Sequence, residues 1–169
     1  MKKIILATLI SGAMSASALA VNAGTGTVTF KGSIISAPCS IAPGEENQEV
    51  PLGQVSDVIL TAGGASSAQP FSIQLEGCNL KGDNTVKVTF NGTESTNTGM
   101  LQITGEASGA AVKIMSSSGA QIKVNSVHEQ QYVKGDNELK FTAALQGLEG
   151  ATVVPGDFSA VTNFELAYQ

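Results

Sequence analysis

The chain has 169 residues, a formal net charge of −5 and nine basic residues, all of them lysine. An acidic chain without arginine binds phosphate groups poorly, so we exclude nucleic acid as a partner. The basic clusters that draw proteins to anionic lipid are missing from the sequence as well.

The first 20 residues have the pattern of a secretory signal peptide. Two lysines precede the apolar run 4–10, and a tract of small residues follows. Cleavage after Ala20 is preferred, and Ala23 offers a second site. The apolar run is far shorter than the roughly 20 residues that span a bilayer. We therefore expect an exported protein with no membrane anchor.

Cys39 and Cys78 are the only cysteines, and both lie in the exported part, where disulfides form and persist. A metal pair or a reactive thiol is the alternative. A zinc site needs about four ligands, however, and His128 is the only other soft ligand. We predict a disulfide that closes a loop of about 40 residues and stabilises the fold by roughly 4 kcal/mol in the chain-entropy model.

Residues 24–32 alternate strictly between two faces, as strand residues do. Threonines and Lys31 occupy one face. The other face carries Gly24, Gly26, Val28, Phe30 and Gly32. So many glycines make a poor strand by itself, because glycine loses much entropy on ordering and packs nothing. The pattern alone favours a frayed strand of the protein's own sheet, and pairing with another chain is the alternative.

Short strand-like segments follow along the whole chain, separated by glycine- and proline-rich turns. They are residues 33–41, 49–55, 71–78, 85–91, 100–104, 111–116, 121–127, 138–145 and 158–169. Pro38 lacks an amide donor, so the first of these segments should lie at a sheet edge or break there. Apolar residues nowhere recur at helical spacing over three turns. The sequence therefore predicts one all-β sandwich domain.

The last segment, residues 158–169, has a mostly apolar face and a mostly polar back. The apolar face carries Phe158, Ala160, Thr162, Phe164, Leu166 and Tyr168. Because the chain then stops, either an earlier strand covers this one or its edge and apolar face remain open to another chain.

No motif for catalysis is recognisable. His128 is the only histidine, and no nucleophile-elbow pattern accompanies it. The glycines form neither a phosphate loop nor a dinucleotide fingerprint, and the acidic residues lack calcium-loop spacing. We expect no enzyme, no catalytic residue, no metal site and no cofactor.

Taken in order, these motifs resemble those of pilin subunits of the bacterial chaperone–usher pathway, and most closely the major rod subunits of P-pilus-like fimbriae. The similarity covers the whole exported chain and rests on residues 26–32, 37–41 and 52–54, on the segment around Cys78, and on residues 158–169. Its C-terminal signature has a penultimate aromatic residue, here Tyr168, and a glycine fourteen positions from the end, here Gly156.

The resemblance implies an incomplete immunoglobulin-like β-sandwich that lacks its last strand and is completed in trans by a donor strand. It divides the chain into a signal peptide (1–20), a donor-strand extension (21–32) and a pilin domain (33–169). The donor residues would be those of the alternating face, from Gly24 to Gly32. The acceptor groove and chaperone-recognition strand would comprise Gly156, Phe158, Phe164, Leu166, Tyr168 and Gln169.

The resemblance also implies partners and a location. A periplasmic chaperone and an outer-membrane usher would deliver the subunit to a homopolymer, the fimbrium, at the cell surface, where it supports adhesion. Two alternatives stay open. One is a minor or adaptor pilin of the same pathway, and the other is a self-contained secreted β-sandwich that binds a carbohydrate or another ligand.

Overall fold

The computed structural model describes residues 25–80, 82–96 and 98–169. The chain divides into two units, Met1–Ile34 and Ile35–Gln169. In the first unit, residues 25–34 form neither helix nor strand, and all of them are exposed. We call residues 25–34 the N-terminal extension. The expectation of a frayed strand in the protein's own sheet is thus wrong for residues 25–32, while Gly24 lies outside the described residues.

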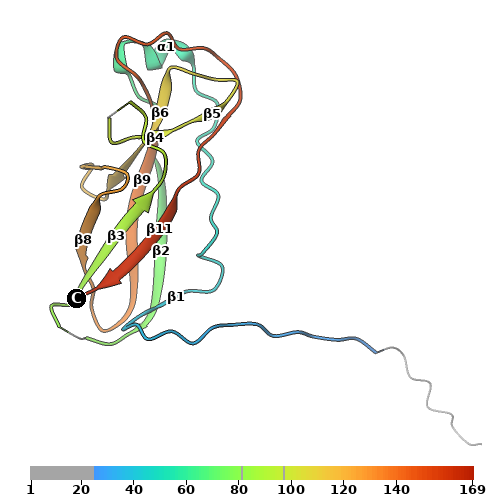
Figure 1. Cartoon of the computed structure of the whole chain (residues 1–169), viewed down its shortest axis with the longest axis vertical. Helices are drawn as coiled ribbons and strands as arrows, with labels where there is room; N and C mark the ends of the chain where they lie inside the picture. Colours follow the sequence, from blue (N-terminus) through green and yellow to red (C-terminus); the bar gives the residue numbers. More distant parts are fainter. Residues whose placement is uncertain (1–24, 81, 97) are drawn as a thin grey trace, which may run out of the picture. The chain divides into compact units, whose positions relative to one another are not determined.

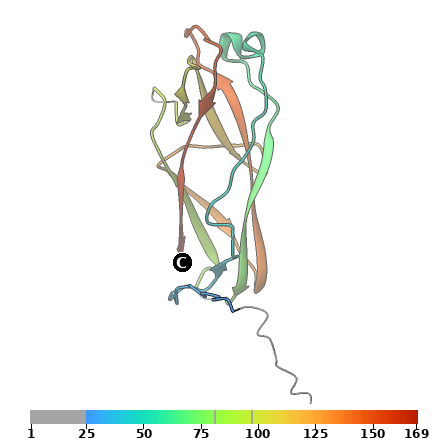
Figure 2. The ribbon, with the colours of Figure 1, turned by 90° about the vertical axis from the view of Figure 1, so that its right-hand side faces the viewer.

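The second unit is a β-sandwich (Figures 1 and 2). Its larger sheet has the order β1-β2-β9-β6-β4, with β7 also paired to β6, and its smaller sheet has the order β11-β3-β8. A separate pair joins β10 to β5. Every one of these pairings is antiparallel.

The strands are β1 (Ser40–Ile41), β2 (Gln69–Cys78), β3 (Thr85–Asn91), β4 (Leu101–Gln102), β5 (Thr104–Gly105), β6 (Ala110–Ser116), β7 (Gln121–Ile122), β8 (Val127–Gln131), β9 (Gly135–Gly147), β10 (Phe158–Ser159) and β11 (Asn163–Tyr168). A single helical turn, α1 (Asp57–Leu60), continues into the 3-10 turn η1 (Thr61–Gly63). The described residues are thus nearly all strand, turn or loop, as the sequence predicts.

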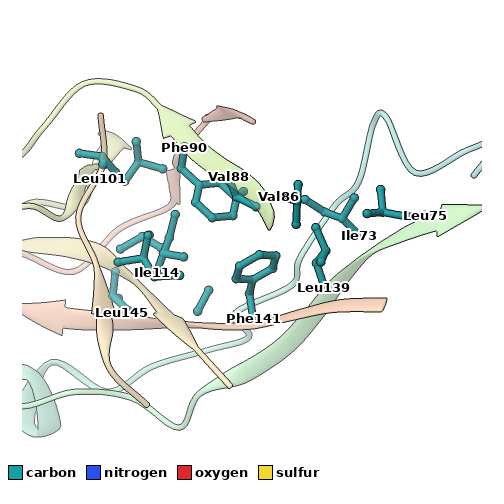
Figure 3. Close-up of a cluster of buried hydrophobic side chains, with 14 of the residues drawn as sticks. Ile73, Leu75, Val86, Val88, Phe90, Leu101, Ile114, Leu139, Phe141 and Leu145 are labelled. Atoms are coloured by element: carbon teal, nitrogen blue, oxygen red, sulfur yellow. The ribbon is translucent and has the colours of Figure 1, made fainter. Parts of the chain in front are cut away.

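The core lies between the two sheets, where alternate side chains of facing strands meet (Figure 3). Val86, Val88 and Phe90 of β3 are almost fully buried, whereas Lys87 and Thr89 between them are less so. From the larger sheet, Ile73, Leu75, Leu139 and Phe141 point at the β3 side chains, each with at most 2% of its surface exposed. Period-2 patterning therefore sets the inward face of each long strand.

Cys39 and Cys78 form a disulfide, with Cα atoms 4.2 Å apart. Both residues are buried, one just before β1 and the other at the end of β2. The amide of Asn79 also donates a hydrogen bond to the carbonyl of Pro38, at 2.9 Å. The bond predicted from sequence is thus present, and it ties the start of the second unit to the end of its longest early strand.

Two of the predicted early strands are largely missing. Of residues 33–41, only Ser40 and Ile41 are paired, because the chain bends over residues 37–39 around Pro38. Residues 49–55 form no strand at all. Pro51 has no amide to donate, and Gly53 has a φ of +72°, which is outside the range of strand residues. Local backbone chemistry overrides the apolar alternation in both places.

Two later predictions also needed correction. Residues 121–127 break after β7, because Asn125 adopts a φ of +60° and its side chain bonds both the amide and the carbonyl of Gly92. The strand β8 that follows was not predicted, since its sequence is polar. Residues 158–169 form two strands rather than one. The partner β3 ends at Asn91, opposite Asn163, so the residues before β11 pair with β5 instead.

Candidate functional site

An open groove of about 950 Å³ lies along one side of the sandwich. One wall is residues 48–55, which connect the loop after β1 to α1, and the other wall is residues 155–162, which lead into β11. In Figure 2 the first wall is the blue-green segment that rises beside β2. We call this feature the groove, and its walls the 48–55 wall and the 155–162 wall.

The floor of the groove is the hydrophobic core itself. It consists of Phe71, Ile73, Leu101, Val112, Ile114 and Ala143, which come from β2, β4, β6 and β9. Ile73, Leu101 and Ile114 expose between 1% and 3% of their surface, whereas Phe71 is only half-buried. Among the floor residues, Phe71 is therefore the one with surface left for an incoming apolar side chain to cover.

The strands beside the groove have main-chain amides and carbonyls that another strand could pair with. Among the residues that the structure describes, the smaller sheet ends at β11, which pairs only with β3. On the other side, β2 pairs with β1 at only two positions, Glu76 and Leu75. A strand edge of this kind is a template for another strand. The groove thus combines an apolar floor with an edge that can accept an extended chain.

Two of the six predicted acceptor residues line the groove, namely Gly156 and Phe158. A Cβ atom on Gly156 would lie 2.8 Å from the backbone nitrogen of Ala107, which is too close for any other residue without a shift. Phe158 is half-buried and packs against the core. The position of both residues is set by the pairing of β10 with β5.

Phe164, Leu166 and Tyr168 lie further along on β11 and are not among the groove-lining residues. All three are half-buried and pack against the core, while the residues between them are exposed. The predicted alternation is therefore present from Phe158 to the end of the chain. The apolar face extends beyond the groove toward the C-terminus.

The chain end is anchored by main chain and by an aromatic contact. The amide of Gln169 donates to the carbonyl of Thr85 at 3.1 Å, and the Tyr168 ring meets the Tyr132 ring edge-on, with centroids 5.8 Å apart. Desolvation raises the pKa of Tyr168, and the nearby Tyr132 adds to the effect. The terminal strand is thus ordered up to its last residues although one of its edges has no strand beside it.

The N-terminal extension presents apolar side chains to water. Val28 is 75% exposed and Phe30 is 89% exposed. A Cβ atom built on Gly26 or on Gly32 would meet nothing within 4 Å. Burial of a side chain such as Val28 or Phe30 stabilises by about 1.5–3 kcal/mol. The extension therefore exposes apolar surface whose burial would be favourable.

Residues 49–55 were predicted as a strand and not as a groove wall, and the floor residues from β4 and β6 were not predicted to line a groove. Leu52 and Val55 pack against the core from an irregular segment, so neither helical nor strand periodicity marks them. The only indication in the sequence that this segment packs against the core was that Leu52 and Val55 are both apolar and stand three residues apart, beside Pro51 and Gly53. Leu101 and Val112 read as ordinary core positions, and only the topology places them under an opening.

Other kinds of site are not recognisable in the described ranges. Within residues 25–80, 82–96 and 98–169, no three His, Cys, Asp or Glu side chains gather as metal ligands would. The same residues contain no helix long and apolar enough to cross a membrane. His128 is half-buried, with its ring centroid 6.3 Å from that of Phe141, and burial lowers its pKa.

An antiparallel sandwich that is open along one terminal strand and carries a separate apolar extension is typical of pilus subunits built by strand addition. The chain belongs to the fimbrial protein family, whose model matches residues 28–169. It is 48% identical to the "Major MR/P fimbria protein" of Proteus mirabilis, over 92% of this chain and 91% of that protein. It is 47% identical to the "Fimbria A protein" of Serratia marcescens, over 100% and 99% of the two chains.

Solved structures agree with this family. A chain from a chaperone–usher pilus whose rod uncoiling was studied superimposes with a TM-score of 0.79 and 32% identity, over 90% of this chain and all of that one. The P pilus rod subunit PapA superimposes with a TM-score of 0.70 and 34% identity, over 79% and 100%. The fold is thus that of chaperone–usher pilins, an immunoglobulin-like sandwich, as the sequence motifs implied.

Proposed function

We propose that this protein is the major structural subunit of a bacterial surface fimbria, and that it polymerises by donor-strand exchange. In each contact the N-terminal extension of one subunit fills the groove of the next. Val28 and Phe30 enter the groove, while Thr27 and Thr29 remain on the outer face. Because this contact joins two unlike surfaces, it does not close on itself, and repetition of it builds a filament.

The observation that carries this proposal is the match between two exposed features. The groove leaves apolar residues such as Phe71 and Phe158 only half-buried, and the extension exposes Phe30 to 89%. Each feature alone leaves apolar surface in water, and joining them buries both. A strand beside β11 would also satisfy the edge of that strand.

The chain organisation follows from the same mechanism. Residues 1–20 act as signal peptide, residues 21–32 as donor segment, and residues 33–169 as pilin domain. Before polymerisation, a periplasmic chaperone inserts one of its own strands into the groove. The chaperone also binds the terminal strand of the subunit, including Phe164, Leu166, Tyr168 and Gln169. An outer-membrane usher then exchanges the chaperone for the next subunit, and the product is a fimbria on the cell surface.

The two alternatives have less support. A minor or adaptor pilin would use the same contact, but the relatives that match over nine-tenths or more of their length include a protein named as a major fimbria protein. A self-contained secreted sandwich would bury its own aromatic residues, whereas here Phe71 and Phe158 remain half-buried in the groove.

The test is a charge placed on the apolar face of the extension. Phe30→Asp should abolish fibres in electron micrographs, because burying an unpaired carboxylate costs several kcal/mol. The control is Thr29→Asp, which puts the same charge on the outer face and should leave fibres intact. Chaperone-bound subunit should form in both strains and should accumulate in the Phe30→Asp strain. Normal fibres from Phe30→Asp would refute the donor role of the extension.

A further inference from the structure

The groove and the extension carry opposite charges. The only charged residues among those lining the groove are Glu49 and Asp157, and both are acidic. No lysine nitrogen in the described part of the chain lies within 4 Å of either carboxylate, since the ion pairs there are Lys87–Glu129 and Lys140–Glu138. The only charged residue of the extension is Lys31.

The two acidic residues mark opposite ends of the groove. The 48–55 wall runs toward α1, whereas the 155–162 wall runs away from that end and toward β11 (Figures 1 and 2). Glu49 stands near the start of the first wall and Asp157 near the start of the second. A second acidic residue, the exposed Glu106, neighbours Asp157 along the main chain, because its amide donates to the carbonyl of Asp157 at 2.9 Å.

The direction of insertion decides which end Lys31 reaches. Every strand pair in this domain is antiparallel, and antiparallel pairs are the more common kind. In an antiparallel insertion, residue numbers rise along the extension as they fall along the 155–162 wall. The half-buried Phe158 and Ala160 of that wall offer apolar surface against which Phe30 can pack. The next residue, Lys31, then lies on the outer face, one step closer to Asp157.

We propose that Lys31 of one subunit forms an ion pair with Asp157 of the next, with Glu106 adding to the negative potential there. This inference rests on the proposed function and goes further, because it makes Lys31 a specificity-determining residue. An extension with an acidic residue at this position would meet two carboxylates and would be disfavoured. The apolar residues supply the burial, and the ion pair selects which extension enters.

The pair lies at the rim, where the Asp157 side chain is exposed. Charges in such positions act mainly on the rate of association and on its dependence on salt. Lys31→Glu should therefore slow fibre assembly by about tenfold at low ionic strength, and the difference should shrink at high salt. Asp157→Lys should have the same effect, since it leaves like charges facing each other.

The decisive measurement is a charge swap in the full-length subunit. Lys31→Glu combined with Asp157→Lys in one chain should restore assembly toward the wild-type rate, measured as fibre yield per cell. The matched control combines Lys31→Glu with Glu49→Lys, which should not restore it. Rescue by the Glu49 swap alone would overturn the inference and would indicate parallel insertion.

Cysteine crosslinking gives a second readout that does not depend on rates. Fibres of the Lys31→Cys and Asp157→Cys double variant, treated with a short bis-methanethiosulfonate crosslinker that spans the reach of a lysine side chain, should show a covalent ladder on a non-reducing denaturing gel, and dithiothreitol should dissolve it. The Lys31→Cys and Glu49→Cys variant should remain monomeric on the same gel. Intact fibres without the first ladder would overturn the pairing and leave the donor role standing. Failure of the Phe30→Asp test would instead remove the proposed function itself.

Discussion

Phe71 of β2 and Phe141 of β9 are direct cross-strand partners, and their rings stack with centroids 5.4 Å apart. Phe141 exposes only 1% of its surface, whereas Phe71 is half-buried on the floor of the groove. Phe90 of the opposite sheet meets both rings, at 6.1 Å and 5.1 Å. One aromatic cluster therefore belongs both to the core and to the candidate site.

The two phenylalanines should respond differently to truncation. Phe141→Ala should lower the free energy of unfolding by about 3–5 kcal/mol, because it leaves a cavity in a closed core. Phe71→Ala should lower the free energy of unfolding of the free subunit by less. Its main effect should be to destabilise the fibre, in which the groove is filled. Urea unfolding of chaperone-released subunit and of fibres measures the two effects. Equal losses from both substitutions in the free subunit would contradict an open floor at Phe71.

Loss of the disulfide should destabilise the subunit. Cys39→Ser is expected to cost about 2–5 kcal/mol, because the unfolded chain is no longer constrained by a closed loop. The urea midpoint and the periplasmic yield should both fall. Dithiothreitol should lower the midpoint of the wild type but not that of a Cys39→Ser, Cys78→Ser double variant. If dithiothreitol left the urea midpoint of the wild type unchanged, the disulfide would contribute little to stability.

A bulky side chain at Gly26 should block polymerisation only. In the free chain a Cβ atom at this position meets nothing within 4 Å, so Gly26→Leu should leave folding unchanged. In the filled groove the same side chain should clash where the backbones approach closely. Subunits should accumulate with the chaperone, and electron microscopy should show no fibres. Thr27→Leu on the outer face is the control and should still polymerise.

Removal of Tyr168 and Gln169 should reduce accumulation of the subunit. The deletion takes away the contact with the Tyr132 ring and the hydrogen bond to Thr85 at the exposed edge strand. It also removes the residues that we assign to chaperone recognition. Immunoblots of periplasmic extracts measure the amount. Tyr168→Phe keeps the ring and should accumulate normally, and a stable deletion variant would contradict the assignment.

Stability should fall in mild acid because of His128. Burial lowers the pKa of this histidine from its ordinary 6.5. As the pH falls below 6.5, the unfolded chain therefore takes up a proton before the folded chain does, and the free energy of unfolding decreases. Urea unfolding between pH 7 and pH 5 measures the slope. His128 is the only histidine, so His128→Gln should remove the decrease in this window.

The sequence predicted the long strands well. In β3 and β9, alternating apolar residues such as Val86, Val88 and Phe141 coincide with the buried face, because a sandwich buries one side of each strand. The same rule identified the half-buried face of residues 158–168. The sequence did not predict β8, because most of its residues are polar. An edge strand of the smaller sheet can be stable with few apolar residues of its own.

The groove was only half predictable. The 155–162 wall follows from the C-terminal pattern, and Gly156 stands where the backbone must approach Ala107. The 48–55 wall depends on Pro51 and Gly53, which prevent strand pairing without specifying where the segment goes. The floor depends on which strands become neighbours, and this is a property of long-range topology rather than of any local window.

The 48–55 wall is attached to the sheet in an unusual way. Where β2 would accept a neighbouring strand, the Gln48 side chain donates to the carbonyl of Ser72 at 2.8 Å, and residues 49–55 belong to no strand. Leu52 and Val55 provide apolar contacts but no main-chain ladder. Moving the wall outward would therefore cost one side-chain hydrogen bond and the apolar contacts of Leu52 and Val55, but no main-chain hydrogen bond of residues 49–55. A filled fibre and an empty subunit then need not share one groove width, although their sheets keep the same register.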